Sequence, residues 1–446
     1  MLTSILAAAG IFAVLVIVHE AGHFAMAKRL GVRVLRFSIG YPPRIWGIRR
    51  GETEYTVGAT PFGGYVRMLG DEVGENPKPE ALASYLHEIG LDVIGEARKH
   101  GLIAQSSDFD RDLALVAERL AQSGSGIGRE LRADEARLIE EIKSCGGSVA
   151  EAIKGLAEQP PAVLLQSFKK RAFPTQSLGK RVLIVLAGPF SNLLFAPILL
   201  AVVYMVGVPL LLPVVGQVKQ DLPAFKAGLH PGDKIVSLNG EPMESWTDFS
   251  RKIKEGDGSP FKIEVDRKDG AVLRKATIVV TPTKQQQKTI YGTMATTWVV
   301  GVLPRGDQTF KRYGPISAVG EGISTSIDMS GQLIVGIASI FTGAIPVREA
   351  LGGPIMIAQM AGRQAHEGFA NLAMFTVMLS LELGIINLLP VPLLDGGHLL
   401  FFGFEGVLGH PLELRYREMM LQVGLFLLVA LMAFVIFNDI SRIVQG

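Results

Sequence analysis

The stretch from Ile11 to Ala27 reads IFAVLVIVHEAGHFAMA and places His19, Glu20 and His23 within a hydrophobic segment. Residues four apart share one face of a helix, so an HExxH sequence sets two imidazoles one turn apart with a carboxylate beside the first. Two neutral nitrogen ligands and a general base are what a hydrolytic zinc site needs. Ionisable groups are costly inside a membrane and indicate a functional site there. The alternative is a chance occurrence of the motif, which its position in an apolar run disfavours.

The composition is that of a membrane protein with soluble parts. Of 446 residues, 48% are hydrophobic and only 19% are charged, and the mean hydropathy is +0.32; a soluble protein carries more charge. The net charge is +2 and no basic patch with interleaved aromatic residues occurs, so we expect no nucleic-acid partner. The single cysteine, Cys145, excludes an internal disulfide and a cysteine-rich zinc site. Any metal must therefore be held by histidine and carboxylate.

Four stretches are long and apolar enough to span the lipid bilayer. They run from Leu2 to Ala27, from Val182 to about Val215, from about Leu372 to Leu394, and from Met419 to Phe437. A cleaved signal peptide is the alternative for the first stretch. That stretch lacks a basic start, and cleavage near residue 20 would cut the histidine motif, so we reject the alternative.

Basic residues around the first two spans set the expected orientation. One cluster follows the first span and another precedes the second span: Lys28, Arg29, Arg33, Arg36, Arg49 and Arg50, then Lys169, Lys170, Arg171, Lys180 and Arg181. The positive-inside rule places both clusters in the cytoplasm. Residues 216–370 and both termini then lie outside, and the histidine motif lies toward the cytoplasmic side.

Residues 31–70 and 71–170 differ in character. Short segments such as RVLRFSIG and GGYVRML, punctuated by proline and glycine, predict a membrane-associated β-region beside the histidine motif. Its edge is suited to pairing with a substrate, and a plain surface sheet is the alternative. Residues 71–170 are polar with helical periodicity, as in RADEARLIEEIKSCG, and predict a cytosolic helical insertion. His87 and His100 within it are expected to be surface residues.

Residues 214–285 predict a compact domain. The sequence AGLHPGDKIVSLNG, residues 227–240, resembles the signature of a PDZ domain, in which a tight turn feeds a strand and an Asn-Gly hairpin. Such a domain binds an extended peptide at a sheet edge and often captures a C-terminal carboxylate. A spacer domain with a blocked groove is the alternative.

Two histidines need a third protein ligand, and Asp395 is the favoured candidate. It ends the sequence NLLPVPLLD at the end of the third span, where Pro390 and Pro392 break the helix and free backbone groups that need protein partners or a wet cavity. An ordinary helix end at Asp-Gly-Gly is the alternative. His398 is a further candidate ligand, but it follows the Gly-Gly turn and we expect it to face the membrane interface.

Two asparagines are candidates for the surroundings of the metal. Asn387 can donate hydrogen bonds to a polarised carbonyl or to developing oxyanion charge; its alternative role is to satisfy the backbone of the broken helix. Asn192, which ends the sequence AGPFSN in the second span, is expected to pack against the metal helix or to support a ligand.

Jointly, HEAGH with the downstream FSIG, AGPFSN, the PDZ signature and NLLPVPLLDGGH resemble the site-2 protease family of intramembrane zinc metalloproteases, and most of all its bacterial regulator-of-sigma-E type. The motifs occur in the expected order and cover most of the chain outside residues 71–170. The resemblance implies Zn²⁺ bound by His19, His23 and Asp395, with Glu20 as the general base. It also implies that the β-region pairs with an unwound substrate helix.

The resemblance further implies that Asn387, Pro390 and Pro392 shape substrate binding. The implied substrate is a single-pass transmembrane protein of the anti-sigma-factor class, with signal-peptide remnants as a further class. The implied location is the bacterial cytoplasmic (inner) membrane, with the PDZ domain outside and holding a peptide tail or a cleaved substrate end. The chain departs from the family pattern in its insertion at 71–170, in having one legible PDZ domain where some members have two, and in Glu382, where the family commonly has Asn.

A rival interpretation is a catalytically silent, PDZ-bearing membrane scaffold with a structural metal. The intact Glu20 argues against it, because a structural site needs no base and normally has four protein ligands.

The sequence thus predicts a polytopic α-helical membrane protein with four transmembrane helices, a membrane-associated β-region, a cytosolic helical insertion and one extracytoplasmic PDZ domain. The expected order is transmembrane helix 1–30, β-region 31–70, insertion 71–170, transmembrane helix 175–213, PDZ domain 214–285, connector with an amphipathic helix 286–370, transmembrane helix 371–398, cytoplasmic loop 399–418 and transmembrane helix 419–440.

Overall fold

A computed structural model describes residues 2–71, 162–269, 272–288, 294–346, 348 and 352–445, together with a few positions between 72 and 161. Most of the predicted insertion, 71–170, lies outside the described residues. The chain divides into two compact units. One unit comprises Leu6–Leu194 and Leu383–Val429, and the other comprises Met1–Ile5, Phe195–Glu382 and Ala430–Gly446.

The described part of the chain contains five helices that are long and apolar enough to cross a membrane. They are α1 (Leu2–Arg29), α7 (Leu178–Val206), α10 (Pro315–Phe341), α13 (Phe369–Asn387) and α15 (Leu414–Gln445). Four were expected, and the additional one is α10, in the predicted connector. Its mean hydropathy of 1.2 is the lowest of the five, and it exposes Glu321 and Asp328. The chain is therefore a multi-pass membrane protein whose number of spans stays a prediction.

The predicted third span is shorter than its expected range. Helix α13 ends at Asn387, and after an irregular turn a separate helix, α14 (Asp395–Leu408), occupies much of the expected loop 399–418. Proline cannot donate the backbone hydrogen bond of a helix, so Pro390 and Pro392 keep the turn from closing into one continuous helix.

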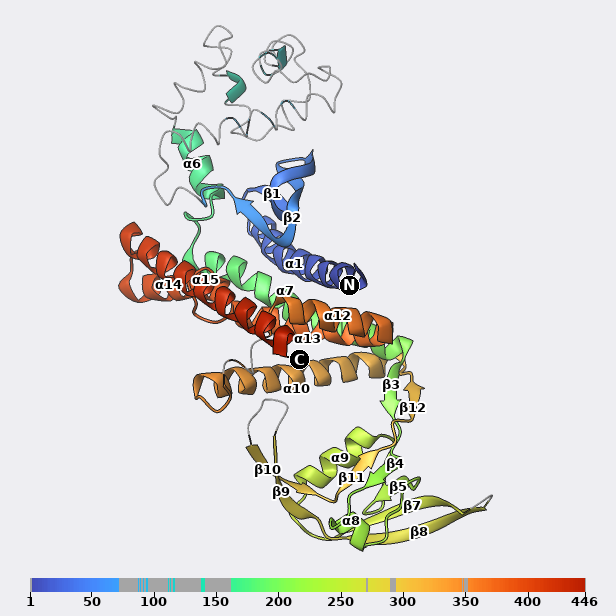
Figure 1. The fold of residues 1–446 in the computed structure, drawn as a ribbon. Coiled ribbons are helices and arrows are strands. Elements are labelled where there is room, and N and C mark those ends of the chain that lie inside the picture. Colours follow the sequence, from blue (N-terminus) through green and yellow to red (C-terminus); the bar gives the residue numbers. More distant parts are fainter. Residues whose placement is uncertain are drawn as a thin grey trace. The chain divides into compact units, whose positions relative to one another are not determined.

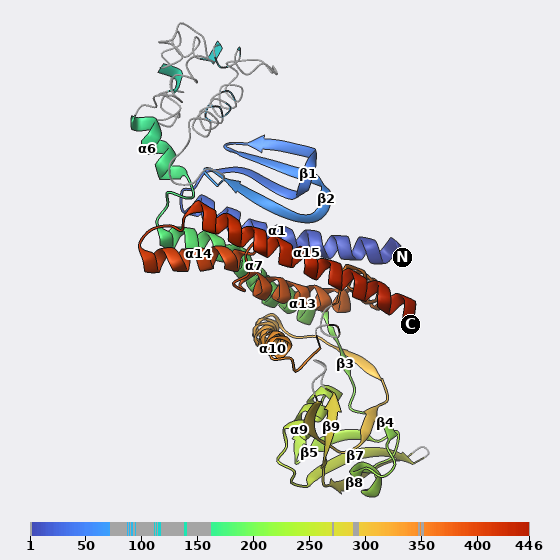
Figure 2. The same ribbon diagram turned by 60° about the vertical axis from the view of Figure 1, so that its left-hand side comes forward.

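Strands β1 (Val34–Arg50) and β2 (Thr53–Met68) form the β-region. Both strands bend, so residues 54–57 pair with 36–39 on one side and with 46–49 on the other, while 36–39 also pair with 64–67. Segment 64–68 therefore forms one edge of the sheet. Figures 1 and 2 show the sheet beside α1. Phe24 of α1 contacts Phe37 and Tyr55, with ring centroids 5.4 and 5.9 Å away.

Residues 214–304 form a β-rich domain. Its main sheet has the strand order β6–β5–β7–β8, and β4 pairs with β11. The elements are β4 (Val215–Val218), α8 (Pro223–Lys226), β5 (Lys234–Leu238), β6 (Glu241–Pro242), α9 (Trp246–Glu255), β7 (Phe261–Asp269), β8 (Val272–Val280), β9 (Thr283–Lys288), β10 (Met294–Val299) and β11 (Val302–Pro304). The domain extends beyond residue 285, the expected boundary, because the three-residue β11 completes it and is too short to recognise from sequence.

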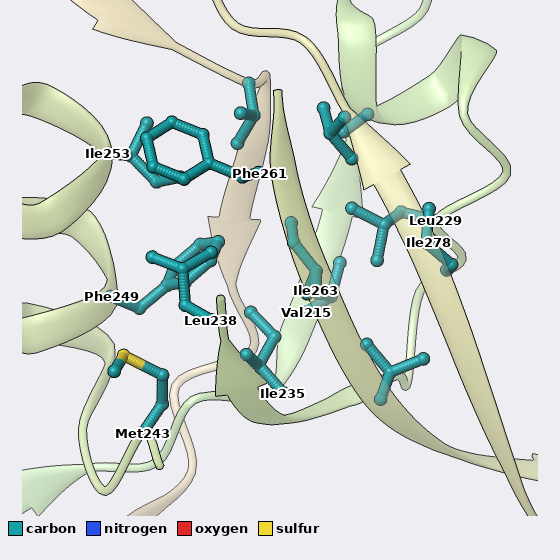
Figure 3. Packing of buried hydrophobic residues seen from close by; sticks show 14 residues of the cluster. Val215, Leu229, Ile235, Leu238, Met243, Phe249, Ile253, Phe261, Ile263 and Ile278 are labelled. Carbon is teal, nitrogen blue, oxygen red and sulfur yellow. The ribbon is translucent and has the colours of Figure 1, made fainter. Parts of the chain in front are cut away.

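The core of this domain lies between α9 and the sheet, as Figure 3 shows. Phe249 of α9 lies beside Leu238 of β5, Ile253 lies beside Phe261 of β7, and all four belong to one buried cluster. Helix α9 begins at Ser245, whose side chain accepts a hydrogen bond from the backbone amide of residue 248 and so satisfies one free donor of the first turn.

The remaining elements are α6 (Ala162–Arg171), β3 (Val208–Leu211), β12 (Gln308–Lys311) and α12 (Pro354–Glu367). Strands β3 and β12 pair and join the β-rich domain to α7 and α10. Asp439 of α15 is buried and accepts backbone hydrogen bonds from Gly353, Ile355 and Met356 at the start of α12. The carboxylate therefore caps α12 and ties it to the last helix.

Candidate metal centre

His19 and His23 lie one turn apart on α1, with their ring centroids 4.9 Å apart. His23 is buried, and its Nδ1 donates a hydrogen bond of 2.8 Å to the carbonyl oxygen of Ile184 on α7. This bond leaves the lone pair of Nε2 free to bind a metal. The two Nε2 atoms are 3.3 Å apart, so both imidazoles present nitrogen atoms to the same point.

Asp395 brings a carboxylate oxygen to that point. Its Oδ2 lies 3.1 Å from Nε2 of His19 and 3.4 Å from Nε2 of His23. In a tetrahedral zinc site with bonds of about 2.0–2.1 Å, neighbouring ligand atoms stand about 3.3 Å apart. The three observed separations match that spacing, and three lone pairs this close repel one another without a cation. The residues present therefore fit zinc.

The turn between α13 and α14 sets the position of Asp395. Leu393 has a φ of 82°, which a bulky side chain rarely adopts. A Cβ on Gly396 would lie 2.0 Å from the carbonyl oxygen of Leu389, and one on Gly397 would lie 2.5 Å from that of Val391. The two glycines thus let the turn fold back against the start of α14. Asp395 is the first residue of α14, and the free backbone amides at a helix N-terminus favour a carboxylate.

Helix α7 packs tightly against the histidine motif. A Cβ on Gly22 would lie 2.2 Å from the carbonyl oxygen of Ala187, and a Cβ on Gly188 would lie 2.2 Å from Nε2 of His23. Ser191 Oγ donates to the carbonyl oxygen of Val18 at 2.7 Å. Sequence reasoning did not single out these contacts, although small residues in both motifs are the usual sign of a close helix pair in a membrane.

Asn192 is fully buried beside the first histidine. Its side-chain nitrogen lies 3.5 Å from Nδ1 of His19. An amide can present either its nitrogen or its oxygen in the same place, and as an acceptor it would fix the His19 tautomer that leaves Nε2 for a metal. The expected position against the metal helix is thus where Asn192 lies.

The three converging groups open into a cavity of about 430 Å³. Glu20, Asn387 and His398 line it, as do residues 63–66 at the edge of the β-region. His398 was expected to face the membrane interface. Instead it lines the cavity, because Asp-Gly-Gly begins a helix rather than ending one and residue 398 lies one turn beyond Asp395.

The two prolines are not among the cavity-lining residues of the described chain. Pro390 is exposed. Pro392 packs against α15, where a Cβ on Gly424 would lie 2.6 Å from the Cβ of Pro392. The predicted role of Pro390 and Pro392 in shaping substrate binding stays a prediction, and it would act through the turn that carries Asp395.

Glu20 lies between the histidines and the β-region. It accepts a backbone hydrogen bond from Val66 of β2. A Cβ on Gly64 would lie 3.0 Å from Cγ of Glu20, so this strand runs directly beside the carboxylate. Tyr41 and Tyr65 stack with ring centroids 6.1 Å apart and line the same side. A carboxylate with room beside it can hold water and move a proton.

Two histidines, one carboxylate and an adjacent glutamate on apolar helices define a membrane metallopeptidase of the zinc-hydrolase class. The sequence comparisons agree: the model of Peptidase family M50 matches residues 7–431. The chain belongs to this family. It is a zinc metalloprotease of the site-2 protease type, and zinc is its cofactor.

Several relatives match along almost their whole length. The zinc metalloprotease RasP of Geobacillus kaustophilus is 30% identical over 450 residues, which cover 99% of this chain and 98% of the relative. The regulator of sigma-E protease RseP of Salmonella typhimurium is 32% identical over 455 residues, 96% of each chain. The regulator of sigma-W protease RasP of Bacillus subtilis is 30% identical over 445 residues, 97% of each chain.

Proposed function

We propose that His19, His23 and Asp395 bind the catalytic zinc and that Glu20 is the general base for hydrolysis of a peptide bond within the membrane. The observation that carries this assignment is the convergence of the three ligand atoms, which lie 3.1, 3.3 and 3.4 Å from one another. Three protein ligands leave one position of a tetrahedral site for water or substrate, as catalytic zinc requires.

Zinc, when bound, supplies Lewis acidity that polarises the scissile carbonyl and acidifies water. Glu20, on the cavity wall, takes the proton from the attacking water and returns it to the leaving amine. Asn387, at the end of α13, donates a hydrogen bond to the developing oxyanion. Asn192 holds the ring of His19 in its metal-binding tautomer. Pro390 and Pro392 keep the turn open so that Asp395 and substrate share the cavity.

The β-region prepares the substrate. A helical peptide bond is engaged in the backbone ladder, so a transmembrane substrate must unwind before cleavage. The edge at 64–68 includes cavity-lining residues and offers backbone donors and acceptors beside Glu20. A substrate strand that pairs with this edge regains the hydrogen bonds lost on unwinding.

We infer a single-pass transmembrane protein of the anti-sigma-factor class as substrate, with signal-peptide remnants as a further class. Two relatives carry the names regulator of sigma-E and regulator of sigma-W protease, which supports this class. The location that follows is the bacterial inner membrane. From the basic clusters at residues 28–50 and 169–181 we infer, by the positive-inside rule, that the metal centre lies toward the cytoplasm. With α10 lying on the membrane surface, four spans put residues 214–304 outside.

The β-rich domain serves in this proposal as a PDZ domain that holds a peptide tail or a cleaved substrate end. Its signature, AGLHPGDKIVSLNG, lies on the turn and strand before α9. A cleft of about 210 Å³ lies between α9 and residues 298–304, with Trp246, Ile253 and Trp298 on its walls. A cleft between a helix and a strand is the kind of site at which such domains bind an extended peptide.

A catalytically silent scaffold is the disfavoured rival. A structural zinc has four protein ligands and no adjacent base. Here three ligand groups converge beside Glu20 and an open cavity, which a structural role does not need.

Cleavage of a transmembrane peptide by the purified, zinc-loaded chain tests the proposal, with the cut bond located by mass spectrometry. The expected result is a cut inside the apolar segment that a chelator stops and added zinc restores. A cut confined to the peptide's soluble ends, or one insensitive to chelation, would overturn it. A substrate with a helix-breaking residue near the cut should react faster if unwinding limits the reaction.

A further inference from the structure

Helix α14 carries Asp395 on its first turn and follows an irregular segment. A helix held at one end by a turn can pivot, and a pivot would move the carboxylate away from the histidines. Metal sites need ligands held within about 0.5 Å of the productive geometry. The far end of α14 must therefore be fixed to something that also fixes α1.

A largely buried ion pair supplies that contact. Arg181, near the start of α7, donates two hydrogen bonds to the carboxylate of Glu405 on the last turn of α14; the bond from Nη1 to Oε2 is 3.0 Å long, and Nη2 bonds Oε1. The side chains are only 9% and 14% exposed. The guanidinium also lies over the ring of Phe402, 5.1 Å from its centroid. A two-bond fork of this kind fixes orientation as well as distance.

The same stretch of α7 holds the histidine motif. Ile184, one turn beyond Arg181, accepts the hydrogen bond from Nδ1 of His23. A further hydrogen bond fixes the Arg181 side chain: its Nε donates to the carbonyl oxygen of Gln176 at 3.1 Å. One turn of α7 thus contacts both the helix of the two histidines and the helix of the aspartate.

We infer that Arg181 and Glu405 are positioning residues for the metal centre: their ion pair sets the angle of α14 and so places Asp395 opposite His19 and His23. This inference rests on the proposed ligand set. The pair touches neither metal nor substrate, so its effect on zinc must pass through Asp395. Its own net stabilisation is modest, because burying two charges offsets much of their attraction.

Zinc affinity of the full-length protein in detergent, measured by competition with a chelator, tests the inference. Glu405→Gln keeps the size of the side chain and removes its charge. We expect it to lower zinc affinity about tenfold, the scale of an outer partner of a metal ligand. In an Asp395→Ala background the same change should alter affinity less than about twofold, because the ligand through which it acts is gone.

Two further variants complete the design. Arg181→Lys keeps the positive charge but cannot form both hydrogen bonds of the guanidinium. Its zinc affinity should lie between those of wild type and Glu405→Gln. If Glu405→Gln does not fold, Arg181→Lys is the variant that tests the inference. Asp307→Asn is the control, since it breaks an exposed ion pair with Arg305 in the other unit and should leave zinc affinity unchanged.

The outcomes separate the two levels of the argument. If the Glu405 change lowers affinity equally with and without Asp395, or not at all, the positioning role is overturned while the ligand set stands. If Asp395→Ala leaves affinity unchanged, the ligand set itself fails. A second readout is the rise in melting temperature on adding zinc, which should shrink in Glu405→Gln if positioning is lost. If Glu405→Gln lowers the melting temperature of the zinc-free and zinc-loaded forms equally, the ion pair has a structural role alone.

Discussion

Gly188 on α7 lies so close to His23 on α1 that a methyl group on its Cα would stand 2.2 Å from Nε2 of the imidazole. A carbon atom cannot lie that close to a nitrogen atom to which it is not bonded. The glycine is thus a condition for the histidine to point at the metal position.

Gly188→Ala should therefore displace the His23 ring and lower zinc affinity by roughly tenfold or more, as loss of ligand orientation does. Zinc content after dialysis of the purified protein would measure it. Gly179→Ala is the matched control: it lies on the same helix, and a Cβ there meets nothing within 4 Å. Equal zinc retention by the two variants would contradict the assigned role of this contact.

Glu20→Gln should keep zinc and lose at least about a hundredfold in cleavage rate, because the amide cannot accept a proton from water. Zinc content and the cleavage rate of a single-pass substrate should be measured on the same sample. Cleavage at the wild-type rate would exclude Glu20 as the base.

Asp395→Ala should lower zinc affinity by more than about a hundredfold, since outer partners alone are worth about 10–100-fold. His398→Ala is the informative comparison, because His398 lines the same cavity one turn further along α14. We expect it to retain zinc. The reverse pattern would make His398 the third ligand.

Asn387→Ala should slow cleavage about a hundredfold, the usual effect of removing one oxyanion donor, while zinc content stays at the wild-type level. Steady-state kinetics would place the loss in kcat. A variant with normal kcat and reduced zinc would instead assign Asn387 to support of the metal site.

In the β-rich domain, Asp233→Ala should destabilise the local fold by about 2 kcal/mol, because it removes the buried acceptor of the Arg267 guanidinium and of the His230 backbone amide. Asp233 is 1% exposed and accepts two hydrogen bonds of 2.7 Å from that guanidinium. Hydrogen exchange of β5 and β7 in the full chain reports the change. Arg251→Ala, which breaks an exposed pair with Asp248, should cost less than about 0.5 kcal/mol.

The zinc chemistry was predictable from sequence because its signals are local. The spacing of HEAGH predicts that its two histidines share one face of a helix, and the two prolines before Asp395 predict a broken helix. The structure brings Asp395 to the histidines across most of the chain, and its role as the third ligand stays a prediction.

The supporting contacts were not predictable, because each joins segments far apart in the sequence. Nothing local indicates that the Ile184 carbonyl accepts from His23, or that Arg181 reaches Glu405. His398 was misplaced for a related reason: glycines after an aspartate are typical of a helix end, yet here they permit a tight turn before a helix begins. The extent of the β-rich domain depended on a three-residue strand with no signal of its own.

The proposed metal site is divided between α1 and α14, which has a consequence for biosynthesis. The histidines enter the membrane with the first helix, but the aspartate follows only after most of the chain has been made. During synthesis the chain therefore contains both imidazoles before Asp395, the proposed third ligand, has been made. On the proposed ligand set, the zinc site is complete only after α14 has been made and packs beside α7.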